Sequence, residues 1–295
     1  MELNILKGTY VVAVSGGVDS VALLHMLHAQ CFAPNYTFIV AHYDHGIRTD
    51  SDKDERLVAT LANDYGMAYE KGEGHLGPNA SEDVARTKRY EFLRKIMKKY
   101  KATAIITAHH QDDLLETILL HVQRGTGRHG LSPMSRTADI VRPLLSYAKS
   151  DIVAYAKQHA LSWNEDSTNS DTKYARNKLR HMLAKNLTEA KRGQLQGLYK
   201  DMLSANNESD MLTASIVSVV TNKQNEIVRS RFVTLPFSVA CECVKFWLKT
   251  EGITAVDKQL ITRCAVAIKT LQIGKKLDCS SGRFLVSQKT SVKIM

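Results

Sequence analysis

Several protein classes are excluded by what the 295-residue chain lacks. It has five cysteines, an odd number at irregular spacing, which provides neither a disulfide framework nor a zinc or iron–sulfur quartet. No apolar run approaches the roughly 18 residues that a membrane span needs, and no charged N-terminal segment precedes an apolar one. Internal repeats and low-complexity linkers are absent as well. We therefore expect a cytoplasmic protein with buried thiols and no membrane partner.

Histidine is absent from the last third of the chain, where positive charge is concentrated. All eleven histidines lie between His25 and His181. Residues 1–185 carry 24 Lys and Arg against 21 Asp and Glu, whereas residues 186–295 carry 16 against 9. Because histidine often carries acid–base, phosphate and metal chemistry near neutral pH, we expect the chemistry in the first part. The basic last third favours a polyanionic partner, since each neutralised phosphate releases counterions.

Composition and length bound the number of domains. A hydrophobic content of 44% with 24% charged residues is typical of a globular chain with a core. At 295 residues the chain is near the upper limit for one core, so we expect one large domain and a smaller one. The change of pattern along the chain places the large domain at 1–185, a helical linker at 186–220 and a small basic domain at 221–295.

The first half alternates strand-like and helix-like segments, which predicts an α/β fold with a doubly wound parallel sheet. Residues 9–14 (TYVVAV) form a short β-branched run, as in a strand that is buried on both faces. Further strands are predicted at 37–42, 103–108 and, with a weaker signal, 140–144, and helices at 20–29, 51–65, 81–101 and 112–124.

The second half is predicted to be a helical segment followed by a small α+β unit. Residues 173–220 have a mostly helical pattern with an interruption near Asn206 and Asn207. After this segment, helices are predicted at 237–250 and 256–270, and strands at 275–279, 283–288 and 291–294. Most of the net positive charge belongs to this half, so the small unit is the expected contact for a polyanion.

A glycine-rich turn, Ser15-Gly16-Gly17-Val18-Asp19-Ser20, follows the first predicted strand. Ligands of open α/β sheets bind beyond the carboxyl ends of the strands, so this turn is a candidate anion site. Its glycines allow close approach of the backbone, and its amides and serine hydroxyls can donate to a phosphate. The lysine-containing G-x-x-x-x-G-K-[ST] loop is absent, which suits cleavage between the α and β phosphates, as in adenylation. The alternative is a Gly-Gly turn that only ends a strand.

A second glycine pattern is a weaker candidate. Gly125, Gly127 and Gly130 match G-x-G-x-x-G, but they follow a predicted helix instead of a strand. The context of a dinucleotide-binding loop is therefore missing. We predict a helix stop and a loop at this place.

A cluster of polar residues follows the strand predicted at 103–108, at the same edge of the sheet. Residues 109–117 have the sequence HHQDDLLET. Adjacent carboxylates at a helix start suit magnesium that also holds phosphate oxygens, and N-terminal capping by Asp112 or Asp113 is the alternative. A third strand end, HYDHGIR at residues 42–48, adds two histidines and an arginine. Its histidines lack the usual spacing of zinc ligands.

These motifs together resemble a known family. SGGVDS is similar to the pyrophosphate loop of the N-type ATP pyrophosphatases, the PP-loop superfamily. With HYDHGIR and HHQDDLLET, the chain resembles the tRNA(Ile)-lysidine synthetases over residues 9 to about 183. The other matching segments, in chain order, are Ser81–Arg86 with Arg89 and Tyr90, Arg124–Leu131, Arg142–Leu145, Glu165–Asn169 and Arg176–Arg180. Beyond residue 186 the resemblance is mainly architectural.

The resemblance implies an ATP-dependent ligase. Such an enzyme converts the wobble cytidine of an isoleucine tRNA with a CAU anticodon to lysidine, and it uses ATP, Mg²⁺ and free L-lysine. Adenylation of the base oxygen at position 2 releases pyrophosphate, and the ε-amine of lysine then displaces AMP. The small C-terminal domain is the expected tRNA-binding part, and a homodimer is left open.

The resemblance also implies roles for individual residues. Asp19, Asp112 and Asp113 would position metal or substrate, and the metal ligands would be Asp112 and Asp113. His109, His110 and Arg86 would neutralise phosphate or transition-state charge. Contacts to ATP are expected from Ser15, Gly16, Gly17, Val18, Asp19, Ser20 and His45. Contacts to lysine or tRNA are expected from Arg124, Asp166, Asn169, Arg176, Asn177 and Arg180.

Alternatives stay open for two of these segments and for the function. Arg86 lies in a run of eight Lys and Arg that ends at Lys101, which is also the pattern of a solvated helix face. Residues 166–169 also fit a turn with a helix cap. A tRNA thiolase that uses the same adenylated intermediate is disfavoured, because Cys31 is the only cysteine in residues 1–185. A noncatalytic RNA-binding protein with a relict ATP fold is the alternative of another class.

Overall fold

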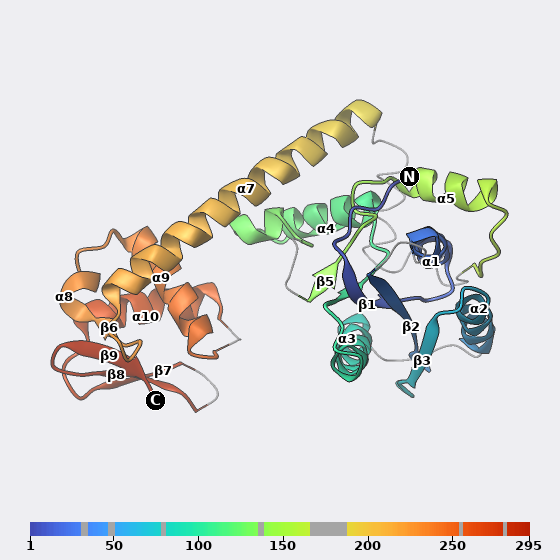
Figure 1. Ribbon diagram of the computed structural model, residues 1–295. Coiled ribbons are helices and arrows are strands. Elements are labelled where there is room, and N and C mark those ends of the chain that lie inside the picture. The colour runs from blue at the N-terminus through green and yellow to red at the C-terminus, as the bar shows by residue number, and fades with distance from the viewer. Residues whose placement is uncertain are drawn as a thin grey trace. The chain divides into compact units, whose positions relative to one another are not determined.

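The chain folds into two units that each have their own hydrophobic core. The computed structural model describes residues 1–30, 35–46, 51–77, 81–134, 139–165, 188–253, 256–279 and 282–295. One unit comprises Met1–Lys200 and the other Asp201–Met295. A five-stranded sheet belongs to the first unit and a four-stranded sheet to the second (Figure 1). Among the described helices, none is both long and apolar enough to cross a membrane.

The sheet of the first unit is entirely parallel, as the alternating pattern predicts. Its strand order is β3-β2-β1-β4-β5. The strands are β1 (Gly8–Ala13), β2 (Tyr36–Asp44), β3 (Ala68–Glu73), β4 (Ala104–Ile106) and β5 (Ile140–Val141). Val11 and Val12 of the central strand are fully buried, one toward each face of the sheet. The continuous apolar run of β1 therefore reflects burial on both faces.

Helices cover both faces of this sheet. They are α1 (Val18–Gln30), α2 (Ser51–Asp64), α3 (Glu82–Lys99), α4 (Gln111–Gln123) and α5 (Lys149–Gln158). Buried side chains of α1, α2 and α5 pack with Val12 in one core cluster, whereas those of α3 pack with Val11 in another. The predicted doubly wound α/β architecture is confirmed.

Three local predictions differ from the structure. The strands and helices include β3 and α5, which the sequence pattern did not reveal. The strand predicted at 140–144 ends at Val141, because Pro143 has no N–H for a ladder. The interruption predicted near Asn206 and Asn207 is wrong: helix α7 (Glu189–Val220) continues through both residues. An asparagine inside a helix costs only tenths of a kcal/mol, which a long helix tolerates.

The second unit packs two helices on a small antiparallel sheet, and the sequence predicted these two helices and three of the four strands. Its elements after α7 are β6 (Ile227–Val228), α8 (Arg229–Phe232), α9 (Phe237–Thr250), α10 (Lys258–Thr270), β7 (Lys276–Asp278), β8 (Phe284–Ser287) and β9 (Ser291–Ile294). The strand order is β6-β9-β8-β7. Trp247 and Phe232 are fully buried in its core. The predicted domain limits at 185 and 220 stay predictions, because residues 166–187 lie outside the described part of the chain.

Candidate active site

A cavity of about 510 Å³ lies at the carboxyl ends of β1, β2 and β4. The strand order reverses between β1 and β4, and open α/β sheets bind ligands in the crevice at such a point. The volume of the cavity is within the roughly 300–1,000 Å³ that small-molecule sites occupy. Six residues predicted from the sequence line it: Ser15, Asp19, Ser20, His45, His109 and Asp113.

The glycine turn is closed by its own serines and held from outside by Asn164. Ser20 Oγ donates to Gly17 O at 2.9 Å and accepts from Ser15 N at 3.2 Å. Gly16 has φ +93°, and its carbonyl accepts from Asn164 N at 3.1 Å. Asn164 Nδ2 also donates at 2.8 Å to Asp54, whose side chain packs against Gly16. These contacts stabilise the conformation of the turn.

The two glycines have different structural roles, which a pair of variants can separate. A Cβ on Gly16 would lie 3.0 Å from Asp54 Oδ1 in a left-handed conformation, whereas a Cβ on Gly17 would have no neighbour closer than 3.7 Å. We expect Gly16→Ala to reduce the free energy of unfolding by about 1–2 kcal/mol. Gly17→Ala should leave stability unchanged. Urea unfolding of both variants is the measurement, and equal losses would contradict the assignment.

His110 and Asp113 cap helix α4, and Asp113 also lines the cavity. His110 N donates to Asp113 Oδ2 at 3.1 Å, and Asp113 N donates to His110 Nδ1 at 3.4 Å. The capping alternative for Asp113 is therefore correct, but the carboxylate also lines the cavity. Because Nδ1 accepts, the neutral ring carries its proton on Nε2. Nε2 lies 3.5 Å from Asp113 Oδ2 and 3.7 Å from Asp19 Oδ2.

Lys149 connects two of the predicted aspartates, although no sequence motif pointed to it. Its Nζ donates to both carboxylate oxygens of Asp19 at 2.6 Å. Its backbone N donates to Asp112 Oδ2 at 2.7 Å. Lys149 is the first residue of α5, so the starts of α1, α4 and α5 meet around these carboxylates.

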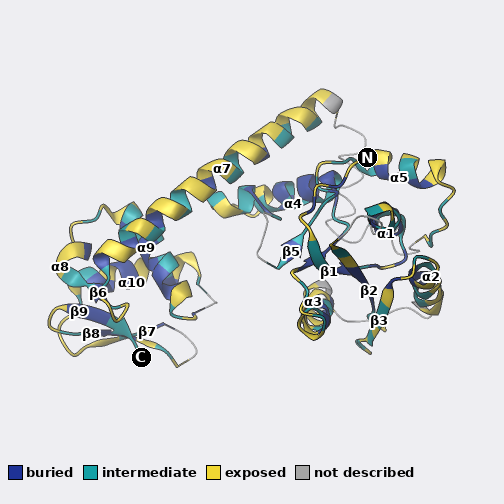
Figure 2. Cartoon of the chain, viewed as in Figure 1, coloured by how far each residue is buried: buried dark blue, intermediate teal, exposed yellow. Residues whose placement is uncertain are grey.

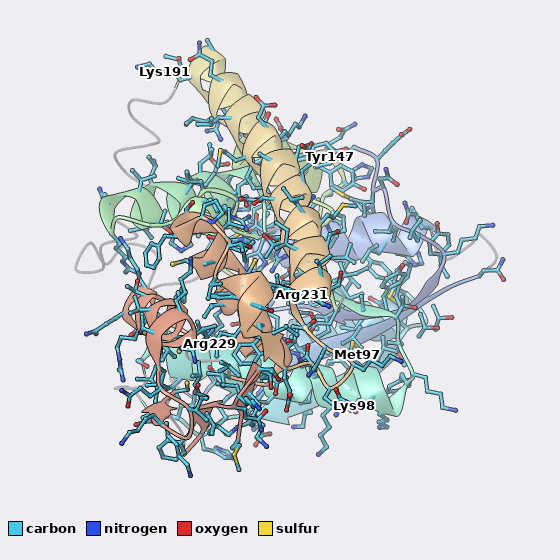
Figure 3. The ribbon with its side chains drawn as sticks, turned by 90° about the vertical axis from the view of Figure 1, so that its left-hand side faces the viewer. Met97, Lys98, Tyr147, Lys191, Arg229 and Arg231 are labelled. Carbon is cyan, nitrogen blue, oxygen red and sulfur yellow. The ribbon has the colours of Figure 1, made fainter. Side chains whose placement is uncertain are left out.

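Asp112 is held by cationic and backbone donors and is not among the residues that line the cavity. Arg192, next to Lys191 at the start of α7 (Figure 3), donates to Asp112 Oδ1 at 2.7 Å and to Gln111 Oε1 at 2.9 Å. Burial alone would raise the pKa of Asp112. The hydrogen bonds from Lys149 N and Arg192 outweigh this effect and hold the pKa below its usual value. Asp112 is therefore a carboxylate at neutral pH that positions its neighbours.

His109 lines the cavity as a neutral imidazole. Its Nδ1 and Thr107 Oγ1 form a hydrogen bond of 2.8 Å. Burial, followed by the positive charges of Arg142, Arg86 and Arg89, lowers the pKa of His109 to about 3. At neutral pH it can hydrogen-bond to a phosphate oxygen but carries no positive charge toward it.

The arginine of α3 that reaches the cavity is Arg89. Arg89 lines the cavity, whereas Arg86 is exposed, with its guanidinium 5.0 Å from the centre of the Tyr90 ring. Sequence reasoning selected Arg86 and quoted Arg89 only as part of the resemblance. Arg86 and Arg89 are three residues apart and lie on neighbouring parts of one helix face. The sequence pattern alone therefore does not distinguish which of the two reaches the cavity.

The remaining predicted residues fall into two groups. Arg124 is exposed at the end of α4, a helix of 13 residues that begins near Asp112, so it is at the opposite end of the helix. Gly125, with φ +69°, ends this helix, which confirms the predicted helix stop. Five predicted contacts lie outside the described residues: Asp166, Asn169, Arg176, Asn177 and Arg180.

Magnesium fits the donors at this edge only together with phosphate oxygens. Within the described parts of the chain, no three His, Cys, Asp or Glu side chains form a metal-binding group. Mg²⁺ is usually held by one or two carboxylates together with phosphate oxygens of the substrate. Asp19 and Asp113 can supply the carboxylates from the cavity wall. The predicted pair, Asp112 and Asp113, stays a prediction. A zinc site of histidines receives no support in these segments.

The fold and the cavity define a class of α/β proteins that bind a ligand on a glycine turn at the switch point of a parallel sheet. Residues 4–187 match the model of the PP-loop domain family. The chain belongs to this family. The match covers the glycine turn and both of the other strand ends that form the cavity.

Curated relatives agree with this membership. The chain is 40% identical over 185 residues to the tRNA(Ile)-lysidine synthase of Ralstonia nicotianae, covering 60% of this chain and 40% of that protein. It is 32% identical over 252 residues to the Bacillus subtilis protein of the same name, covering 78% and 53%. The chain thus spans about half the length of the curated relatives it matches.

The solved U34-tRNA thiolase NcsA of Methanococcus maripaludis, with its [4Fe-4S] cluster, has a similar fold. It superposes with a TM-score of 0.56 at 16% identity, covering 67% of this chain and 72% of that one. At this identity the likeness concerns the fold alone.

Proposed function

We propose that the protein is an ATP-dependent ligase that joins L-lysine to the wobble cytidine of the CAU-anticodon isoleucine tRNA and forms lysidine. The observation that supports this most strongly is the identity of 32–40% to tRNA(Ile)-lysidine synthases over 185 to 252 residues. The residues that line the cavity lie within the segment 4–187 that matches the PP-loop domain family. The glycine turn, the neutral His109 and the carboxylates at one sheet edge suit chemistry at the α-phosphorus of ATP.

In the first step, the base oxygen at position 2 attacks the α-phosphorus and pyrophosphate leaves. The amides of the turn at Gly16 and Gly17 and the hydroxyl of Ser15 can bind the leaving pyrophosphate. Arg89 supplies positive charge at the cavity wall, and His109 supplies a neutral ring nitrogen. Mg²⁺, held by Asp19 and Asp113, would neutralise phosphate charge during this step.

In the second step, the ε-amine of lysine attacks carbon 2 of the cytosine ring and AMP leaves. The amine must lose a proton to act as a nucleophile, and a carboxylate at the cavity edge can accept it. Asp19 and Asp113, two of the carboxylates that line the cavity, are the proposed acceptors. The lysine contacts predicted from the sequence, Asp166 and Asn169 among them, stay predictions.

The small unit is proposed to bind the tRNA. Exposed cations lie on several of its elements, and one of them, Arg231 of α8, is labelled in Figure 3. The exposed Lys and Arg of this unit are Lys223, Arg231, Lys249, Lys258, Arg263, Lys275, Lys276 and Lys289. Helix α7, of which residues 201–220 belong to this unit, is also largely exposed, as its yellow positions in Figure 2 show.

Neutralising part of this unit should weaken tRNA binding in a salt-dependent way. We expect Lys275→Gln, Lys276→Gln and Lys289→Gln together to reduce the slope of log K against log salt by up to about 0.9 per lost phosphate contact. The control is the same triple change at exposed lysines of the first unit: Lys7, Lys53 and Lys157. Filter binding at several salt concentrations is the measurement. Equal changes in both triples would contradict the assignment.

The proposed reaction is tested by incubating the protein with a CAU-anticodon tRNA transcript, ATP and isotopically labelled lysine. Mass analysis of the digested tRNA should detect one cytidine that carries the labelled lysine. Exchange of labelled pyrophosphate into ATP should require the tRNA. Exchange without lysine incorporation would instead indicate another nucleophile, such as sulfur. Binding with neither activity would indicate an RNA-binding protein without catalysis.

A further inference from the structure

The ammonium group of a lysine in this chain hydrogen-bonds to one of the carboxylates that line the cavity. Lys149 Nζ is 2.6 Å from both Oδ atoms of Asp19, and Asp19 lines the cavity. A divalent cation bound directly to Asp19 would sit about 2.0–2.1 Å from a carboxylate oxygen. A divalent cation and the ammonium group would repel each other across the same carboxylate, and the ammonium already offsets the negative charge that attracts the metal ion. A metal ion on Asp19 therefore binds more weakly while the Lys149 ammonium stays in place, and movement of this side chain relieves the repulsion.

The surroundings of Lys149 allow the side chain to move while the helix stays. Its backbone N is fixed by Asp112 Oδ2 at 2.7 Å, and Asp151 Oδ2 accepts from Ala148 N at 3.1 Å. Both contacts hold the start of α5 without using the side chain of Lys149. That side chain is 41% exposed and ends a flexible four-carbon stem. Its release from Asp19 breaks only the contacts of the ammonium group.

We propose that Lys149 is an internal counter-ion that competes with a divalent cation for Asp19. In the nucleotide-free protein it neutralises and orients the carboxylate, and it weakens binding of the free metal ion. A metal ion that arrives with ATP brings phosphate charge, which compensates the displaced ammonium. Lys149 thereby makes the site selective for a metal–nucleotide complex over the free ion. The inference rests on the proposed use of Mg²⁺ with ATP, but not on lysine or tRNA as substrates.

Binding of Mn²⁺ to the nucleotide-free protein tests the competition. The free ion is measured by electron paramagnetic resonance for the wild type and for Lys149→Met, which keeps the length of the side chain and removes its charge. We expect Lys149→Met to bind Mn²⁺ about three- to tenfold more tightly, as for loss of a partly exposed ion pair. Lys149→Arg should retain weak binding, and Lys157→Met, at the exposed end of the same helix, should match the wild type. Adding Asp19→Asn to Lys149→Met should abolish the gain.

Unchanged or weaker Mn²⁺ binding by a folded Lys149→Met protein would overturn the proposal. A measurement on the unaltered protein keeps the test valid if this variant does not fold. Trace acetylation with acetic anhydride, followed by peptide mass analysis, should show that Mg²⁺ increases the labelling of Lys149 relative to Lys157. A constant ratio would also overturn the proposal.

A last comparison separates this inference from the proposed function. Binding of Mn²⁺ together with a non-hydrolysable ATP analogue is measured for the wild type and Lys149→Met. The quantity compared is the ratio of the affinity for the Mn²⁺–nucleotide complex to the affinity for free Mn²⁺. A larger ratio in the wild type than in Lys149→Met supports the counter-ion role, and equal ratios overturn it. If neither protein binds the complex, the proposed ATP-dependent function is wrong. The binding of free Mn²⁺ still tests the counter-ion role of Lys149 in that case.

Discussion

The Asp19→Ala variant should lose tRNA-dependent exchange of pyrophosphate into ATP by about 10³-fold, because it removes a charge that acts on the reacting phosphates. Asp19 is the first-turn carboxylate of α1 and lines the cavity beside the glycine turn. Without it, the Lys149 ammonium loses its partner and the place of a metal-binding carboxylate becomes cationic. Binding of tRNA to the variant should persist, since the exposed cations of the small unit are unchanged. Filter binding measures it in parallel.

Asp151→Ala is the matched control for this variant. Asp151 also lies in the first turn of a helix that starts near the cavity, but it is exposed and accepts from Ala148 N. Its removal should cost about 1 kcal/mol of stability, as for a helix cap, and leave the exchange rate nearly intact. If Asp19→Ala lost tRNA binding and exchange to the same extent, the role of Asp19 would be structural.

The parts of the fold that the sequence predicted are those with strong local patterns. The buried strand β1 has a continuous β-branched run, and the end of α4 has a glycine that adopts φ +69°. Strand β3 was missed because its sequence, AYEKGE, is polar and half exposed at the edge of the sheet. Helix α5 had a usable signal, since Ile152 and Ala156 are four residues apart and both are fully buried.

The candidate site was predictable where it depends on strand ends and not where it depends on distant partners. Asp19, His109 and Asp113 each follow closely on a strand, so the topology rule brings them to one edge. Lys149 is 130 positions from Asp19 in sequence, and Arg192 is 80 positions from Asp112. No local spacing connects such pairs. Lys149 could have been predicted only if the sequence had shown that α5 starts at the same edge of the sheet.

The neutral state of His109 makes the stability of the first unit depend on pH. Its pKa is about 3 in the folded protein, against an ordinary value of 6.5, so below pH 6.5 the unfolded chain takes up a proton that the folded one does not. The stability due to this group is therefore complete above pH 6.5 and is lost as the pH falls toward 3. Between pH 7 and pH 5 the loss should be about 2 kcal/mol. Urea unfolding of the wild type at both pH values measures it.

The His109→Asn variant shows whether His109 causes this loss. Its amide can keep the hydrogen bond that Nδ1 makes with Thr107 Oγ1, and it has no proton to gain. We expect the variant to lose about 2 kcal/mol less than the wild type between the two pH values, with His75→Asn, at an exposed histidine, as the control. The same loss in His109→Asn and wild type would show that other groups cause the acid lability.

A bound nucleotide should reverse part of this effect. After burial, the largest causes of the low pKa of His109 are the charges of Arg142, Arg86 and Arg89, and a polyphosphate in the cavity would neutralise such charges. A non-hydrolysable ATP analogue should therefore raise the pKa of His109, and the ¹³Cε1 signal that is missing in His109→Asn reports it. An unchanged pKa with the analogue bound would mean that the phosphates lie away from His109. In that case the glycine turn would bind the pyrophosphate without a contact from His109.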